Sequence, residues 1–297
     1  MTRARRRLSA EAVTGYLFTV PAAVLIFGLI GFPFVLALWF SVTETWVGRA
    51  GPFVGLANFV RLAHNGAFQQ TFVNSLLYTV GAVLLKAVFG FALALLLLSI
   101  TRFRRLIRGA ILLPFVIPTA LSVLAWWWMF EPTYSVFNWA GRALGLITTD
   151  VPWLSDPWLA RLAIIVVNTW RGLPFFAVTI LAGLVAIPKE YYEAAETDGA
   201  GVWGTFRHVT LPLVKPVLGV VVLFSTILTL ADFNIVYLMT RGGPMNSTHL
   251  FSTLAHQAGM QSGRLSEGAA ISLFMFPVLV AVVVIQLRLV RRQTAYE

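Results

Sequence analysis

The sequence predicts an all-α integral membrane protein with six transmembrane helices and both ends of the chain in the cytoplasm. Three observations support this fold class. The chain is 58% hydrophobic and its mean hydropathy is +0.81. Only 11% of its residues are charged, whereas a soluble domain carries about 25%. Its apolar runs also reach the length of about 20 residues that a helix needs to cross a bilayer. We interpret residues 1–297 as a single membrane domain.

The first predicted span covers residues 16–40, within a stretch that holds no charged residue. The basic residues before it make a signal peptide the alternative interpretation. A cleaved signal has an apolar core of roughly 7–15 residues, however, and this run is longer. We therefore expect an uncleaved first span.

The remaining five spans follow from apolar runs that hold few charges. Lys86 is the charge within the second span, Arg171 is the charge within the fourth, and Asp232 lies near the outer end of the fifth. Tryptophans 126–128 end the third span, as expected where a helix meets the membrane interface. The predicted bounds are about 72–100, 109–130, 160–187, 213–239 and 267–288.

The orientation follows from the excess of Lys and Arg in cytoplasmic segments. Four basic segments alternate with poorer ones, which places both termini, the loop after the second span and the loop after the fourth span inside. The net charge of +10 mostly reflects this distribution, and its spread over separate segments argues against nucleic-acid binding. The basic residues are Arg3, Arg5, Arg6 and Arg7; Arg102, Arg104, Arg105 and Arg108; Lys189, Arg207 and Lys215; and Arg288, Arg291 and Arg292.

The sequence carries no motif for its own chemistry. It has no Cys, no GxxxxGK[ST] phosphate-binding loop, no His-Glu-x-x-His pair and no Gly-x-Ser-x-Gly elbow. Its four His are scattered, so we predict no metal site, no catalytic residues and no cofactor in this chain. If the protein transports actively, a partner must supply the energy.

The polar loop 188–212 between the fourth and fifth spans is patterned. It reads Glu193-Ala194-Ala195, three residues, Gly199, and then Leu211-Pro212 after eleven more residues. Pro188 ends the preceding span, residues 190–197 favour a helix, and Asp198-Gly199 stops it with Gly in the left-handed position. Thr210 and Pro212 suit the start of the fifth span as cap and first-turn residue. An interfacial helix lying on lipid is the alternative, but the helix is acidic and anionic lipids would repel it.

The spacing of this loop resembles the EAA loop of ABC importer permeases, and other parts of the chain resemble the maltose and glycerol-3-phosphate importer type within that family. The resemblance covers nearly the whole chain and implies a type I ABC importer permease fold. The residues that carry it beyond the loop are Tyr16-Leu17-Phe18 with Pro21, Pro33 and Ser41, then Gly55-Leu56-Ala57-Asn58-Phe59, Asn74-Ser75, Leu113-Pro114 with Ile117-Pro118, and residues 240–244.

The resemblance also implies partners and a location. They are a second, homologous permease in a heterodimer, two cytoplasmic ATPases that bind ATP and Mg, and an extracytoplasmic sugar-binding protein. The location is the cytoplasmic (inner) membrane of a bacterium or archaeon. By analogy, Glu193, Ala194, Ala195, Asp198 and Gly199 form the helix that docks on one ATPase, with Leu211 and Pro212 completing the motif.

Polar residues inside the membrane are the candidates for a substrate pathway, because charges there are costly and usually face a cavity or a partner. Arg171 lies near mid-depth with Asn168 and Trp170 beside it, an arrangement suited to a sugar. Lys86 lies mid-span, and Asp232 and Asn234 lie near the outer end of the fifth span. Pairing with the sister permease is the alternative role for Arg171.

We weigh three other functions. A secondary transporter or channel subunit would need a relay of intramembrane acids, and Asp232 is the only candidate. An integral membrane enzyme would need a catalytic constellation that the chain lacks. A polyamine or phosphate permease is the nearest alternative within ABC importers, and an acidic pathway would favour polyamines. The prediction is therefore the permease subunit of an ATP-driven importer for a sugar, a polyol or a sugar phosphate.

Overall fold

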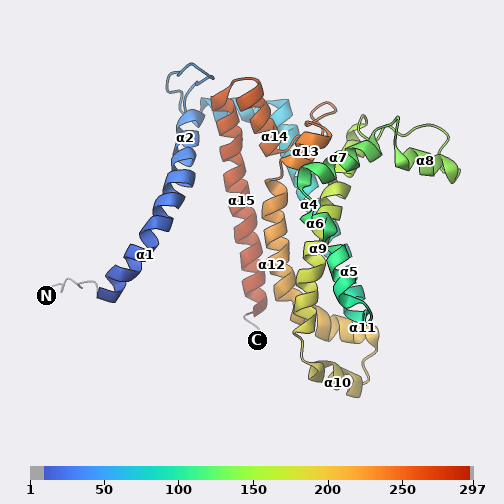
Figure 1. Ribbon diagram of the computed structural model, residues 1–297. Helices are drawn as coiled ribbons and strands as arrows, with labels where there is room; N and C mark the ends of the chain where they lie inside the picture. The colour runs from blue at the N-terminus through green and yellow to red at the C-terminus, as the bar shows by residue number, and fades with distance from the viewer. Residues whose placement is uncertain (1–9, 295–297) are drawn as a thin grey trace.

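A computed structural model of the chain describes residues 10–294 and is built almost wholly of helices. Most of the long helices run side by side, with α8 (Val136–Ala143) near one end of the bundle and α10 (Lys189–Thr197) at the other (Figure 1). We call these the α8 end and the α10 end. Arg3, Arg5, Arg6 and Arg7, on which part of the orientation argument depends, lie outside the described residues.

Five helical stretches within residues 10–294 are long and apolar enough to cross a membrane. They correspond to the first, second, fourth, fifth and sixth predicted spans. The second begins earlier than predicted because the Asn65 side chain caps it, accepting hydrogen bonds from the backbone N–H of Ala67 and Phe68. The stretches are α1–η1–α2 (Ala10–Ile26, Phe27–Gly31 and Phe32–Ser41), α4 (Gly66–Ser99), α9 (Pro157–Val185), α11–η2–α12 (Val202–Thr205, Phe206–Thr210 and Leu211–Leu230) and α15 (Leu265–Thr294).

The third predicted span is not one helix. Residues 104–130 form α5 (Arg104–Ile111), α6 (Leu113–Val116) and α7 (Thr119–Phe130), which together rise along the height of the bundle (Figure 1). Ile117 takes an extended conformation with ψ 133° because it precedes Pro118, and a residue before proline is pushed out of the α region. The apolar run predicted one continuous helix at 109–130, and this was wrong because the run is broken before Pro118. That these three helices together make the third crossing remains a prediction.

The fifth predicted span, 213–239, is wrong at both ends. The helix begins at Val202 and continues to Leu230, so the polar loop is shorter than 188–212. Thr210 makes no cap hydrogen bond and has helical angles, because a π-helical turn at Phe206–Thr210 carries the helix through to Pro212. At the other end residues 231–233 interrupt the helix before α13 (Asn234–Met239).

The core of the bundle is the contact of α4 with α9 and α12. Gly90 and Ala94 of α4 meet Phe176 and Ala177 of α9, all of them buried. Val214 and Val221 of α12 complete the same cluster. Small residues allow two helices to approach closely, which is how helices associate where lipid offers no hydrophobic driving force.

Gly90→Ala is expected to destabilise the bundle by about 1–3 kcal/mol. An added Cβ would clash with Cβ of Phe176, an atom fixed to the backbone of α9. Gly81→Ala is the matched control in the same helix, because its Cβ would lie 3.3 Å from the flexible end of Ile165. Thermal unfolding of the purified permease in detergent measures both. Equal midpoints for the two variants would contradict the close approach at Gly90.

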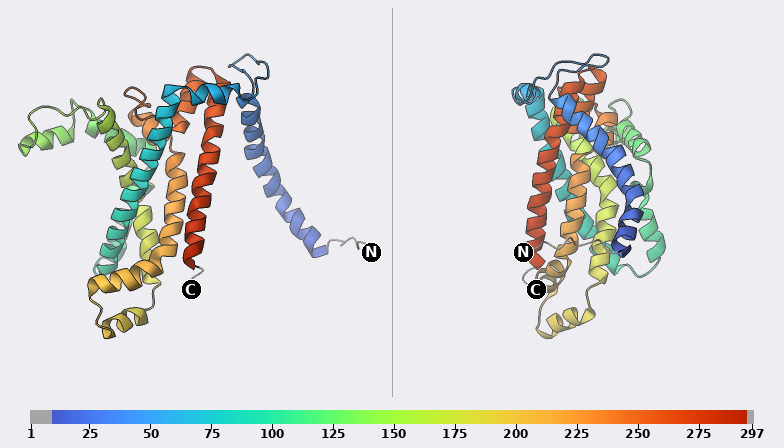
Figure 2. Two further views of the ribbon diagram at one scale, coloured as in Figure 1. Left: turned by 180° about the vertical axis from the view of Figure 1, so that it is seen from behind. Right: turned by 90° about the vertical axis from the view of Figure 1, so that its left-hand side faces the viewer.

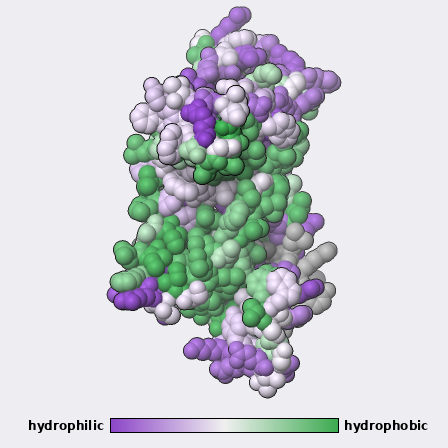
Figure 3. Space-filling model, turned by 90° about the vertical axis from the view of Figure 1, so that its right-hand side faces the viewer, coloured by the Kyte–Doolittle hydropathy of each residue, from purple (hydrophilic) through white to green (hydrophobic). Residues whose placement is uncertain are grey.

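The first helical stretch stands apart from the bundle. Figures 1 and 2 show α1 and α2 leaving the α8 end beside α15 and diverging from it toward the α10 end. None of the most apolar window of Thr14–Ser41 is buried within this chain. Figure 3 shows a belt of hydrophobic residues over the middle of another face, with hydrophilic residues gathered toward both ends. This is the surface pattern of a protein that sits in a bilayer.

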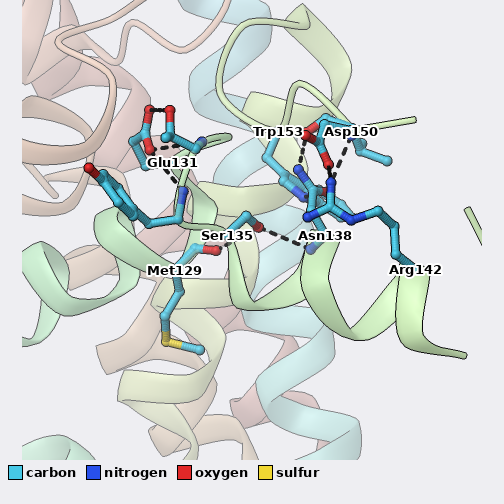
Figure 4. Close-up of polar contacts among 10 residues, drawn as sticks. Met129, Glu131, Ser135, Asn138, Arg142, Asp150 and Trp153 are labelled. Atoms are coloured by element: carbon cyan, nitrogen blue, oxygen red, sulfur yellow. Dashed lines mark hydrogen bonds and ion pairs between the residues drawn. The ribbon is translucent and has the colours of Figure 1, made fainter. Parts of the chain in front are cut away.

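The lobe at the α8 end is held by a buried asparagine (Figure 4). Asn138 of α8 (Val136–Ala143) accepts hydrogen bonds from the Val151 N–H at 3.2 Å and the Trp153 indole at 2.9 Å. Ser135 caps α8, and Arg142 pairs with Asp150. Three further short elements lie in the described chain: α3 (Ala57–Ala63), α14 (Phe251–His256) and η3 (Gln257–Gln261).

Candidate functional site

The α10 end presents a short helix that projects from the bundle (Figure 1). Helix α10 (Lys189–Thr197) begins after Pro188 and is followed by Asp198 and then Gly199, which has φ +76°. Gly199 N–H donates to the Glu196 carbonyl and Ala200 N–H donates to the Ala195 carbonyl, which together form a Schellman motif. The helix stop predicted from Asp198-Gly199 is therefore present, with Asp198 as the C-cap.

Most of α10 is free to contact a partner. Ala195 is its buried residue, whereas Glu193 and Ala194 are exposed. None of the four acidic side chains of residues 190–198 forms an ion pair with the described residues. Val202 and Trp203 stand beside them, 91% and 70% exposed. An acidic helix next to exposed apolar side chains suits a partner surface with a basic rim and an apolar pocket.

Leu211 and Pro212 do not belong to this exposed tip. They lie in the first turn of α12, beyond the π-helical turn. The Thr210 hydroxyl lies 3.5 Å from the Tyr192 hydroxyl and links that turn back to α10. The motif therefore joins the projecting helix to a long helix of the bundle.

A cavity of about 350 Å³ lies among α4, α9, α12 and the break at 231–233. This is within the roughly 300–1,000 Å³ of ligand pockets. Five of the six predicted pathway residues line it, and these come from three separate spans: Lys86, Asn168, Arg171, Asp232 and Asn234. Trp170 is not in the lining; it packs edge to face on Trp126 at 5.5 Å between ring centroids.

A hydrogen-bond network crosses the cavity wall. Lys86 Nζ donates to Asn168 Oδ1 at 2.8 Å and to Thr229 Oγ1 at 2.9 Å. Asn168 Nδ2 donates to Asp232 Oδ2 at 3.0 Å, and the Tyr78 hydroxyl donates to the same oxygen at 2.6 Å. The network connects α4 and α9 to the break after α12. A lysine and an aspartate are thereby satisfied in a region where an unpaired charge would be costly.

Asp232 is held from several directions because it occupies the break. Its Oδ1 accepts from the Ile235 N–H at 3.4 Å, and its carbonyl accepts from the Ser252 hydroxyl at 2.5 Å. These contacts replace the helical hydrogen bonds that the break interrupts. In a membrane, such irregular backbone is tolerated where it is buried in protein or lines a cavity.

Aromatic rings form the apolar part of the wall. Phe115 of α6 stacks on Phe175 of α9 with centroids 6.0 Å apart and planes 16° from parallel, and Phe233 also lines the cavity. Sequence reasoning missed these three residues together with Tyr78 and Thr229. Tyr78 lies eight residues before Lys86, about two helical turns, and this shared face was a usable signal. The Phe115–Phe175 contact had none, since it depends on the break in the third span.

The described residues contain no group of three or more His, Cys, Asp or Glu placed to hold a metal ion. The cavity has the parts for binding a polar organic molecule, because both hydrogen-bonding groups and flat apolar rings line it. The projecting helix at the α10 end and the cavity inside the bundle are therefore two separate candidate sites.

Comparison with known proteins places these features in a family. Residues 86–295 match the family described as binding-protein-dependent transport system inner membrane component. The chain is 34% identical over 283 residues to the trehalose/maltose transport system permease protein MalF of Thermococcus litoralis, covering 95% of each chain. It is also 34% identical to the sulfoquinovosyl glycerol transport system permease protein SmoG of Agrobacterium fabrum, covering 95% of this chain and 91% of the relative.

The fold is likewise found among solved structures. A crystal structure of a bacterial alginate ABC transporter, in complex with an alginate pentasaccharide-bound periplasmic protein, matches with a TM-score of 0.82. The match covers 95% of both chains at 21% identity. The overall fold of this chain is therefore one that also occurs in an ABC transporter.

Proposed function

This chain belongs to the family of binding-protein-dependent transport system inner membrane components and is the permease of an ABC importer, and we propose that its cargo is a sugar, a polyol or a sugar phosphate. The cavity supports this proposal most directly. Amide, hydroxyl and charged groups and two stacked phenylalanines together line a cavity of about 350 Å³. A sugar offers hydroxyls to the first wall and an apolar ring face to the second.

The names of the relatives support the same cargo class, since one is a trehalose/maltose permease and another a sulfoquinovosyl glycerol permease. A polyamine permease is the alternative that the cavity disfavours. Its lining carries two cationic side chains, Lys86 and Arg171, against the single carboxylate of Asp232. A polycation would meet like charge there.

The partners we propose are a second, homologous permease, two cytoplasmic ATPases that bind ATP and Mg, and an extracytoplasmic binding protein. Two features of this chain support them. The exposed acidic surface of α10 fits an ATPase groove, and Glu193 and Ala194 lie at its centre. The helical stretch α1–η1–α2 diverges from α15 (Figure 2), and its most apolar window is not buried by this chain, so helices of a sister permease would cover it.

The cargo proposal is tested on the assembled importer in proteoliposomes, with its own sister permease, ATPases and binding protein. Uptake is measured for radiolabelled maltose, trehalose, glycerol and glycerol 3-phosphate, with spermidine and inorganic phosphate as probes of the rival classes. We expect uptake from the sugar and polyol group only. ATP-dependent uptake of spermidine or phosphate alone would replace the proposal with the rival class.

We propose that the α10 end is cytoplasmic, and cysteine labelling tests this cleanly because the chain has no Cys of its own. Arg104→Cys lies at the start of α5 near the α10 end, and Ala50→Cys lies in the loop at the α8 end (Figure 1). In intact cells an impermeant thiol reagent is expected to label position 50 and spare position 104. Both must react after the membrane is permeabilised. The reverse pattern in intact cells would invert the orientation.

A further inference from the structure

The charges that line the cavity do not balance. Lys86, Arg171 and Asp232 are its three charged side chains. Lys86 and Asp232 are joined through Asn168, and the attraction between the ammonium and the carboxylate extends along this link. Each of the two has hydrogen-bond partners within the chain. Arg171 therefore carries the excess positive charge of the cavity.

Arg171 has no such partners. Within the described residues its guanidinium forms no hydrogen bond and no ion pair, and its Nε is buried without a partner. The side chain as a whole is half-buried and lines the cavity. An unpaired arginine at this depth is costly, and such residues mark binding sites or pathways. Its planar set of donors matches the oxygens of carboxylate, sulfonate or phosphate groups.

The position of Arg171 relative to the aromatic wall defines what can bind. Phe175 lies four residues after Arg171, so the two share one face of α9 about one helical turn, or roughly 5.4 Å, apart. Phe115 of α6 stacks on Phe175, and both rings line the cavity. A sugar ring lying against these phenylalanines would bring an acidic substituent on that ring within reach of the guanidinium.

We propose that the cargo carries an anionic group, which Arg171 receives inside the cavity while the sugar ring contacts Phe115 and Phe175. This inference rests on the proposed function and narrows it to sugar acids, sugar sulfonates or sugar phosphates. The competing assignment is an acidic residue of the sister permease that pairs with Arg171 for structure. The two differ in whether the assembled cavity attracts free anions.

The first experiment reads the electrostatic potential of the cavity in the assembled complex. Thr119→Cys places a thiol in the lining, and Leu228→Cys is a second reporter in case the first fails to fold. Each is treated with an anionic sulfonatoethyl and a cationic trimethylammonioethyl methanethiosulfonate. Arg171→Gln is expected to lower the anionic-to-cationic rate ratio about tenfold, and Arg171→Lys to preserve it. Ser155→Cys, exposed in the loop before α9, is the control whose ratio should not respond.

An unchanged ratio in Arg171→Gln would mean that a partner acid already neutralises the guanidinium, and this overturns the proposal. The proposal would also be overturned if the cavity thiols, with Arg171 in place, reacted with the same anionic-to-cationic rate ratio as the thiol of Ser155→Cys.

The second experiment identifies the cargo class by uptake through the reconstituted importer. Glucose, galactose, maltose and trehalose are each compared with the corresponding uronate and 6-phosphate. We expect the anionic sugars to be taken up, and the comparison of uronates with 6-phosphates shows whether the cargo carries a carboxylate or a phosphate.

Arg171→Gln should raise the KM for the anionic cargo at least tenfold, and Arg171→Lys should return the KM most of the way to its unsubstituted value. Transport of neutral sugars alone, unaffected by Arg171→Gln, would overturn this inference and leave sugar import standing. Uptake of no member of the series would count against sugar import itself.

Discussion

Glu193→Arg and Gly199→Val are each expected to abolish transport while the permease still inserts and assembles with its sister subunit. Both positions are exposed at the tip of the α10 end, so neither substitution alters the buried core of the bundle. Arginine at 193 would place like charge against a basic groove of an ATPase, which can cost several kcal/mol. Valine at 199 would resist φ +76° and undo the Schellman motif that ends α10.

The two variants should fail differently. Glu193→Arg should lower the recovery of the ATPase in pull-downs, whereas Gly199→Val should retain the ATPase in a complex that does not respond to cargo. The deciding measurement is the ATPase activity of the reconstituted complex, with and without loaded binding protein. Stimulation and uptake at the unsubstituted level in both variants would show that α10 is not the coupling element.

Matched controls isolate each cause. Gly201 has open space around its α-carbon, as Gly199 does, but its φ of −70° is one that valine adopts readily. Gly201→Val should therefore keep far more transport than Gly199→Val, although both add the same side chain to the same loop. Glu193→Gln removes the charge without inverting it and should give an intermediate loss of ATPase recovery.

The α10 loop was predictable because its signals are local. Pro188 and Gly199 act on their own backbone, so the start and the stop of the helix can be recognised from the sequence. Composition and length likewise predicted the five helical stretches that are long and apolar enough to cross a membrane. The two breaks were harder: Pro118 and Asp232 interrupt apolar runs that hydropathy treats as continuous. Pro118 was a readable signal, whereas the break at 231–233 depends on partners from α4, α9 and α14 that satisfy Asp232.

The cavity was only partly predictable for a related reason. Intramembrane charge identified Lys86, Arg171 and Asp232 individually, because burying a charge in a bilayer demands an explanation. The sequence could not show that Lys86 and Asp232 are linked while Arg171 is left unpaired. Asn168 makes this link, because its side chain accepts from Lys86 and donates to Asp232. Trp170 looked like part of the pathway from its neighbours in sequence, but the turn of α9 directs it to Trp126.

Lys86→Met and Asp232→Leu are expected to destabilise the permease by about 2–5 kcal/mol each, because each leaves buried polar groups without partners. Loss of Lys86 removes the donor to Asn168 and Thr229. Loss of Asp232 removes the acceptor for Asn168 and Tyr78 and opens the break at 231–233. Tyr78→Phe deletes one donor only and should cost about 1 kcal/mol.

A variant that combines both substitutions shows whether Lys86 and Asp232 act as one network or as two independent sites. Each single variant leaves one buried charge without its counter-charge. The double Lys86→Met, Asp232→Leu variant has neither charge and so avoids that cost. Its loss of stability should therefore be smaller than the sum of the single losses by at least about 1 kcal/mol, measured by thermal unfolding in detergent. The double variant should not transport cargo, because it has lost the polar groups that line the cavity. Additive losses would mean that Lys86 and Asp232 act separately and that Asn168 does not couple α4 and α9 to the break.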